Sequence, residues 1–123
     1  MVLERYSLPL LRIALSIVFL YFGYQQITDG AAWTGFVPVF ATQFGLAALQ
    51  LVSMNAILEL VLGTFLFIGL YTRFSALILS LHLFGISFSL GLNPLGMRDF
   101  GLACATFAIF LAGADEFCLD SHL

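Results

Sequence analysis

The chain has 123 residues, of which 62% are hydrophobic and 9% are charged, and its net charge at neutral pH is −3. An ordinary soluble domain is about 45–50% apolar and about 25% charged, and a chain this short cannot hide so much apolar surface from water. A soluble enzyme is therefore close to excluded. Nucleic-acid binding is excluded because four Lys and Arg against seven Asp and Glu leave no basic stripe for phosphates. The composition predicts an integral membrane protein.

A helix needs about 20 mostly apolar residues to cross roughly 30 Å of hydrocarbon. We expect membrane-spanning helices at residues 8–27, 50–70, 75–92 and 100–114. Because the last span is the shortest, it is expected either to continue toward Leu119 or to lie in a locally thinned bilayer. Short polar turns join the second span to the third and the third to the fourth, so we expect the helices of each of these two pairs to be adjacent in space. The predicted fold class is all-α, with the whole chain forming one antiparallel transmembrane bundle of four helices.

The segment of residues 29–49, between the first two spans, is too apolar for a free loop and too interrupted by Gly30, Gly35 and Pro38 for another span. It is expected to lie at the membrane interface, where aromatic side chains prefer to sit. The alternative is a lid over a pocket that opens to the outer leaflet. The aromatic residues concerned are Trp33, Phe36, Phe40 and Phe44.

The basic residues predict the orientation of the chain. With a cytoplasmic N-terminus, Arg5, Arg12 and Arg73 lie inside and Arg98 lies outside. The excess of positive charge inside favours both termini in the cytoplasm, in a multi-pass protein of the inner (plasma) membrane. Arg12, one turn into the first span, is expected to snorkel to the headgroups. No cleavage site follows the first span, which predicts an uncleaved anchor helix.

Small residues at helical spacing are expected at the helix–helix contacts, because lipid offers no hydrophobic drive for association. They are Gly63 in the second span, Gly85 and Ser89 in the third, and Gly101, Ala105, Ala108 and Ala112 in the fourth.

The two cysteines, Cys104 and Cys118, are not expected to pair with each other. Fourteen residues of helix would separate them by about 21 Å, which is far beyond the reach of a disulfide. Cys118 is expected to be a free thiol near the membrane surface on the reducing side.

Glu59 is the acidic residue that lies inside a predicted span, about 16 Å from its cytoplasmic end. Such a group faces the bundle or a wet cavity and indicates function by default. His82 in the third span lies at a similar height, so Glu59 and His82 form a candidate proton relay and are the candidate catalytic residues. The alternative is an interhelical hydrogen bond that fixes packing. No metal site is predicted, because Glu59, His82, Asn55 and Cys104 have no recognised ligand spacing.

A polar pocket is predicted in the outer half of the bundle, at the depth that Ser87 and Ser89 share. Its substrate-binding residues are Asn55, Gln25, Gln26, Arg98 and Asp99. Their amide and guanidinium donors suit a carbonyl headgroup such as that of a quinone, and they equally suit ordinary interhelical bonds. Asp99 also fits the N-cap of the fourth helix.

Several short motifs follow one another along the chain. The first helix carries Leu11-Arg12-Ile13-Ala14-Leu15 and then residues 19–23; the second carries Glu59-Leu60 through Gly63 and ends in Gly69-Leu70-Tyr71-Thr72-Arg73. The last helix contains Arg98-Asp99-Phe100-Gly101-Leu102, and the chain closes with Cys118-Leu119-Asp120. With these motifs in this order, nearly all of the chain resembles the DoxX family of small four-span membrane proteins. The family often has a lysine where this chain has Gln26, so any role of that lysine is filled differently here or is absent.

The resemblance implies a role near quinone-linked redox chemistry, with Glu59, Arg98 and Asp99 as its polar positions, and it supplies no mechanism. Two functions follow, and whether the chain catalyses a reaction stays open. The first is a subunit of a membrane redox complex that binds quinone without any covalently bound cofactor. The second is a non-catalytic accessory subunit that stabilises a larger membrane complex through helix–helix contacts. The expected partners are membrane lipids and other membrane subunits.

Overall fold

The computed structural model describes residues 2–37, 39–43 and 45–122, and these are all-α, as predicted. The long helices are α1 (Ser7–Thr28), α3 (Ala48–Ile68), α4 (Thr72–Leu90) and α5 (Pro94–Ala112), and each is long and apolar enough to cross a membrane. Shorter elements join or flank them, namely the 3-10 helices η1 (Val2–Tyr6), η2 (Gly30–Phe36) and η3 (Leu119–His122) and the single-turn helix α2 (Val39–Thr42).

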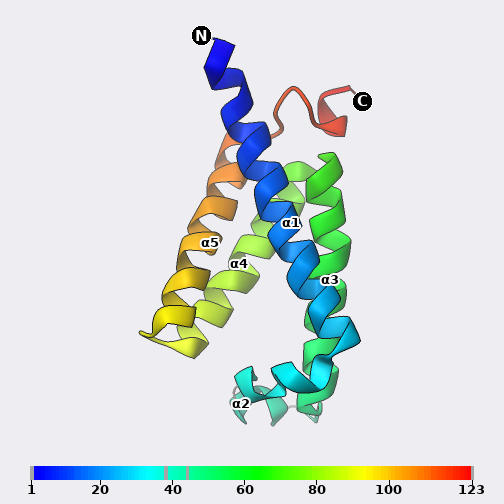
Figure 1. The fold of residues 1–123 in the computed structure, drawn as a ribbon, viewed down its shortest axis with the longest axis vertical. Coiled ribbons are helices and arrows are strands. Elements are labelled where there is room, and N and C mark those ends of the chain that lie inside the picture. The colour runs from blue at the N-terminus through cyan, green and yellow to red at the C-terminus, as the bar shows by residue number, and fades with distance from the viewer. Residues whose placement is uncertain (1, 38, 44, 123) are drawn as a thin grey trace.

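The long helices pack as two antiparallel pairs (Figure 1). Helix α1 lies along α3, and α4 lies along α5, with fewer contacts between the pairs. Both chain termini lie at one end of the molecule, whereas η2 and α2 lie at the opposite end. The pairs meet near the end that holds the termini and diverge toward the other end.

Glycines allow α1 and α3 to approach closely. A Cβ at Gly23 would lie 2.8 Å from Leu60 Cγ, and a Cβ at Gly63 would lie 3.2 Å from Phe19 Cβ. The prediction for Gly63 therefore agrees with the structure.

The small residues of α5 lie elsewhere than expected. Helix α5 buries Ala103, Thr106 and Ile109, whereas most of the predicted contact stripe is exposed, at Gly101, Ala108 and Ala112. Gly85 of α4 is exposed as well. The prediction failed because other residues form the buried faces of α4 and α5, among them Ala76, Ser80, Gly96 and Ala103, which leaves the predicted stripe turned outward.

Helix α5 begins at Pro94, six residues before the predicted start. Asn93 is its N-cap, because its side-chain oxygen accepts a hydrogen bond from the Gly96 N–H at 2.8 Å. Proline at the first helical position has a backbone already suited to the helix. Asp99 therefore lies inside α5, and its prediction as the N-cap was wrong.

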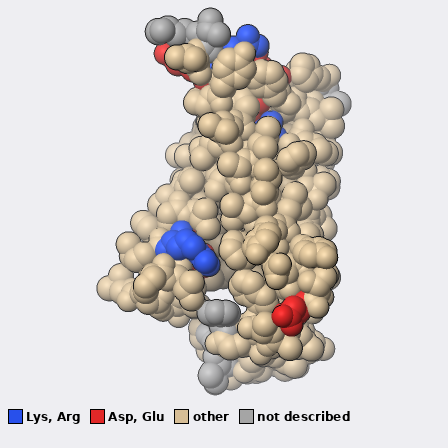
Figure 2. Space-filling model, viewed as in Figure 1, with Lys and Arg blue, Asp and Glu red and all other residues tan. Residues whose placement is uncertain are grey.

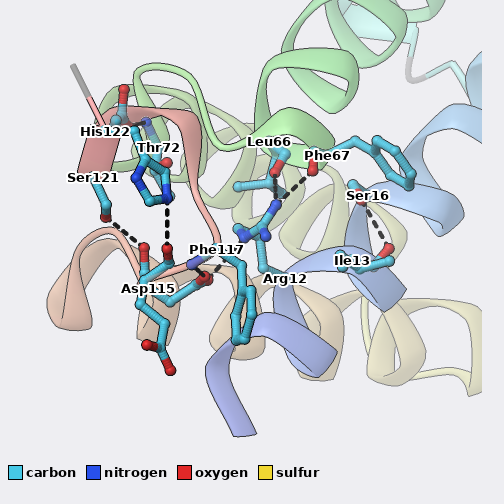
Figure 3. Close-up of polar contacts among 12 residues, drawn as sticks. Arg12, Ile13, Ser16, Leu66, Phe67, Thr72, Asp115, Phe117, Ser121 and His122 are labelled. Carbon is cyan, nitrogen blue, oxygen red and sulfur yellow. Dashed lines mark hydrogen bonds and ion pairs between the residues drawn. The ribbon is translucent and has the colours of Figure 1, made fainter. Parts of the chain in front are cut away.

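Arg12 does not snorkel to the surface (Figure 3). Its side chain is 3% exposed and pairs with Asp115, with Nε donating to Oδ2 at 2.8 Å. Its Nη1 also donates to the carbonyl oxygens of Leu66 at 2.8 Å and Phe67 at 2.5 Å, both in the last turn of α3. The prediction was wrong because the chain following α5 supplies a counter-charge and the helix end supplies acceptors.

The C-terminal tail, residues 113–122, continues across this end of the bundle. The carboxylate of Asp120 accepts hydrogen bonds from the N–H groups of Tyr71 at 2.8 Å and Thr72 at 2.7 Å, so it caps the start of α4. Cys118 is buried against Gly69, where an added Cβ would lie 2.5 Å from the Cys118 Cα. Both cysteines are free, as expected, and Cys118 is buried within the tail contact.

The charged side chains are unevenly distributed on the face shown in Figure 2. They gather at the end that holds the termini, and a broad uncharged band separates them from two charged patches in the other half. Exposed apolar side chains on the long helices include Ile17, Ile57, Leu81 and Leu111. Such a band suits contact with lipid, and together with the four apolar helices it defines a multi-pass membrane protein.

Candidate functional site

A cavity of about 280 Å³ lies between the two helix pairs, at the end away from the termini. All four long helices contribute to its wall, and most of the wall is apolar. In Figure 2 the surface is hollowed in this half of the molecule. The polar wall residues are Gln26, Asn55, Glu59, His82, Ser89, Arg98 and Asp99. A mostly apolar cavity with a few convergent polar groups is the usual form of a small-molecule site.

Glu59 is the most deeply buried polar group of the wall, with 4% of its surface exposed. Its Oε2 atom is buried and has no hydrogen-bond partner among the described residues. Helix α3 directs it inward because Val52, Ala56 and Gly63 share its buried face at helical spacing. The prediction that Glu59 points into the bundle agrees with this placement, but a hydrogen-bonded partner for Oε2 is missing from the described part of the chain.

Three polar side chains from three helices form a hydrogen-bonded chain beside the cavity. Asn55 Nδ2 on α3 donates to Gln26 Oε1 on α1 at 2.5 Å. The Oδ1 of the same Asn55 contacts Nε2 of His82 on α4. The predicted pairing of His82 with Glu59 is replaced by this pairing with Asn55, which lies one helical turn from Glu59.

A charged and aromatic group forms the part of the wall nearest the α4–α5 turn. Arg98 donates from Nε and Nη2 to Asp99 Oδ1, at 3.2 and 3.1 Å. The Arg98 guanidinium also lies 5.3 Å from the ring centre of Phe22, a cation–π geometry. Phe22 in turn meets Trp33 edge to face, with ring centres 5.7 Å apart.

The connector between α1 and α3 reaches the cavity. Trp33 and Val37 line its wall, which is the placement that the lid interpretation requires. Phe40 is exposed. The prediction for Phe44, like that for Pro38, lies outside the described residues, and the side chain of Phe36 is not described.

Gln25 is not among the described residues that line the cavity, although its neighbour Gln26 is. Successive residues of a helix point about 100° apart, so the two amides face different directions. Gln26 follows Phe19 by seven residues and shares its buried face. Ser87 likewise has another role, since its hydroxyl donates to the Gly96 carbonyl at 2.9 Å and joins α4 to α5.

The signal that separates Gln26 from Gln25 was present in the sequence, because Phe19, Gly23 and Gln26 recur at helical spacing. The wall position of Phe22 was not predicted, since its aromatic side chain equally suits lipid contact, whereas that of Trp33 fits the lid alternative. Among the described residues, no three His, Cys, Asp or Glu side chains come close enough together to hold a metal ion.

The fold and the cavity define a class: an all-α, multi-pass membrane protein with a few polar groups converging on an apolar cavity inside its bundle. The family model of DoxX matches residues 7–92, which is more than half of the chain, and the chain belongs to the DoxX family. The match confirms the resemblance inferred from the sequence, and it ends before Arg98 and Asp99. Searches of curated proteins and of solved structures found no match to the chain.

Proposed function

We propose that this protein is a membrane subunit linked to quinone and quinol redox chemistry, and that the cavity between its helix pairs holds the quinone head. Glu59 is the residue that handles the proton, and Asn55 and His82 orient the head. Arg98 and Asp99 hold the end of the cavity wall near the α4–α5 turn.

The observation that carries the proposal is the buried, unpartnered Oε2 of Glu59 in a cavity with mostly apolar walls. A buried polar atom without a partner costs about 1–3 kcal/mol, and in lipid an ionisable group is retained mainly where it serves a function. A ligand that presents a polar atom to Glu59 would remove this cost.

The size and lining of the cavity support a ring-shaped ligand. At about 280 Å³, the cavity exceeds the about 150 Å³ that accommodates benzene in an engineered protein core. It lies near the lower limit of small-molecule sites, at roughly 300 Å³. The apolar wall suits the ring, and the polar groups at Glu59 and His82 suit its oxygen atoms.

The test uses the fluorescence of Trp33, which is the single tryptophan of the chain and lines the cavity. Titration of the purified protein in nanodiscs with decylubiquinone should give a saturable quench. Gln26→Leu should weaken binding about tenfold, comparable to the loss of one hydrogen bond, because it removes a polar wall group and releases the Asn55 amide that positions His82. The matched control, Gln25→Leu, should leave the affinity unchanged.

A quench that rises linearly with the quinone content of the lipid, identically in both variants, would overturn the proposal.

A second candidate function is the accessory subunit, favoured by the small face of α5 that this chain leaves exposed at Gly101, Ala108 and Ala112. Small residues let membrane helices approach closely. Loss of a co-purifying membrane protein in Gly101→Leu, with no quinone binding by the unaltered protein, would favour this function.

We also propose the orientation: the protein lies in the inner (plasma) membrane with both termini in the cytoplasm. Arg5 and Arg12 lie at the end that holds the termini, and Arg73 follows the turn at that end, whereas Arg98 lies at the other end. Cys118 is buried, so an introduced cysteine is the better probe. The side chain of Leu92 is 96% exposed. In a background without Cys104 and Cys118, the cysteine of Leu92→Cys should therefore react with an impermeant maleimide on intact cells. Ser121→Cys should react only after lysis, and the reverse pattern would refute the orientation.

A further inference from the structure

We propose that the cavity recognises a head that donates hydrogen bonds, so that it binds the hydroxyl-bearing quinol more tightly than the quinone. This inference rests on the proposed function and adds the chemical form of the ligand. It also gives Gln26 and Asn55 a positioning role, because they set the hydrogen-bonding character of His82.

The inference rests first on the direction of the hydrogen bonds that link Gln26, Asn55 and His82. Asn55 uses its Nδ2 to donate to Gln26 Oε1. The same amide therefore presents its oxygen to His82, whose Nε2 contacts it. An amide oxygen only accepts, so the proton of the His82 ring lies on Nε2. The Nδ1 of the neutral ring then carries a lone pair and is a hydrogen-bond acceptor.

The inference rests second on the hydrogen bonds that the Glu59 carboxyl group can make. A carboxylate accepts hydrogen bonds only, whereas a carboxylic acid both donates and accepts. A ligand hydroxyl satisfies the buried Oε2 in either form, since it can donate and accept as well. A quinone carbonyl satisfies Glu59 only in the protonated form, and it offers nothing to Nδ1 of His82.

The inference rests third on the charged side chains of the cavity wall. The Arg98 guanidinium is already paired with Asp99 through two nitrogens, so Arg98 has its counter-charge within the chain. Besides this pair, the charge-bearing wall residues are Glu59 and His82. A carboxyl group disfavours an anionic head, so a neutral donor such as a hydroquinone is the chemistry that the wall fits best.

The binding test compares three ligands with the same ring substituents and decyl chain by competition for the Trp33 quench. They are decylubiquinol under reducing, oxygen-free conditions, decylubiquinone, and the dimethyl ether of the quinol, which keeps the ring but removes both donors. Sites built to bond a hydroxyl reject analogues that lack it. We expect the quinol to bind at least tenfold more tightly than the other two. Gln26→Leu should reduce this preference, whereas Gln25→Leu should preserve it.

The outcomes separate this inference from the proposed function. Equal or tighter binding of the quinone overturns the inference and leaves the proposed function standing. Failure of all three ligands to bind overturns both.

A second measurement tests the positioning role without any ligand. Nitrogen-15 NMR of labelled imidazole distinguishes the ring forms of histidine, and His122→Asn removes the only other histidine signal. We expect His82 to carry its proton on Nε2, and we expect Gln26→Leu to shift this population. A ring protonated on Nδ1, or on both nitrogens, would overturn the inference.

Discussion

Glu59 combines two properties that a purely structural residue rarely combines. It is 4% exposed within a bundle of apolar helices, and its Oε2 atom has no partner among the described residues. A side chain that only fixes packing gains stability from its hydrogen bonds, whereas this oxygen contributes none. At the scale of the single residue, the structure therefore favours a ligand-facing role for Glu59 over a packing bond.

This contrast gives the first prediction. Glu59→Leu replaces the unpartnered oxygen with an apolar side chain of similar size, so the ligand-free protein should gain stability, by about 1–3 kcal/mol at most. Glu59→Gln keeps a polar group and should leave stability nearly unchanged. Thermal unfolding in detergent measures both variants, and quinol binding should be lost in Glu59→Leu. A large loss of stability in Glu59→Leu would show that Glu59 holds the bundle together.

The sequence predicts which residues lie at depth better than it predicts their partners. Hydropathy and helical rise were enough to place Glu59 inside the bundle. The partner of His82 depends on how α3 and α4 are rotated about their axes, and one helical turn separates Asn55 from Glu59. Sequence periodicity does not specify that rotation, which is why the Asn55–His82 contact was not predicted.

At the scale of elements, the C-terminal tail is the segment that departs furthest from the sequence-based expectations. It supplies Asp115 to Arg12 and Asp120 to the start of α4. The Arg12–Asp115 bond joins residues 103 positions apart. Nothing local in the sequence indicates such a pairing, and the rule that arginines near helix ends snorkel pointed the other way. The early start of α5, by contrast, could have been predicted from Asn93-Pro94, because asparagine is a favourable N-cap and proline is favoured at the first helical position.

The tail contains two neighbouring acids paired with two arginines, which provides an internal control for the second prediction. The side chains of Arg12 and Asp115 are 3% and 6% exposed, whereas those of Arg5 and Glu116 are 47% and 49% exposed. Arg12→Met leaves a buried charge unpaired and should cost about 3–5 kcal/mol. Arg5→Met should cost about 1 kcal/mol or less. Equal effects of the two variants on thermal unfolding would mean that the buried pair does not anchor the tail.

The third prediction concerns acid. Burial alone would raise the pKa of Asp115, but the hydrogen bonds from Arg12 and from the Phe117 N–H, together with the Arg12 charge, bring that pKa below its usual value. Asp120 behaves similarly, because the N–H groups of Thr72 and Tyr71 outweigh burial and lower its pKa. Lowered pKa values stabilise the folded tail above the ordinary value of about 3.9, and this stability is lost as the pH falls through the lower, folded-state values.

The tail should therefore stay docked at pH 5–7 and detach below about pH 4. The reaction of Cys118 with dithiodipyridine, in a Cys104→Ala background, reports the detachment, since Cys118 lies in the tail and is buried where the tail docks. Asp120→Asn should make Cys118 more reactive at neutral pH. The rate is taken relative to that of a free thiol at the same pH, because only the thiolate reacts. A relative rate that is the same at pH 7 and pH 3 would contradict the role of these carboxylates.

At the scale of the whole molecule, the two helix pairs are fastened at one end and separated by a cavity at the other. The tail and the Arg12 bonds join the pairs near the termini. The cavity lies at the opposite end, where Trp33 and Val37 complete its wall. Four helices and their order were predictable from hydropathy. The division into pairs and the exposed small face of α5 depend on packing between whole helices, so they were not.

Photo-crosslinking locates the bound head and so decides whether the cavity holds a quinone or quinol. A short-chain quinone with a diazirine near its ring would be irradiated with the purified protein in nanodiscs, and its adducts would be mapped by mass spectrometry. We predict adducts on wall residues such as Trp33, Leu83 and Leu102, and their loss on addition of excess decylubiquinol. Adducts on lipid-facing residues such as Leu81 and Leu111, with no effect of the competitor, would place the quinone in the lipid and not in the cavity.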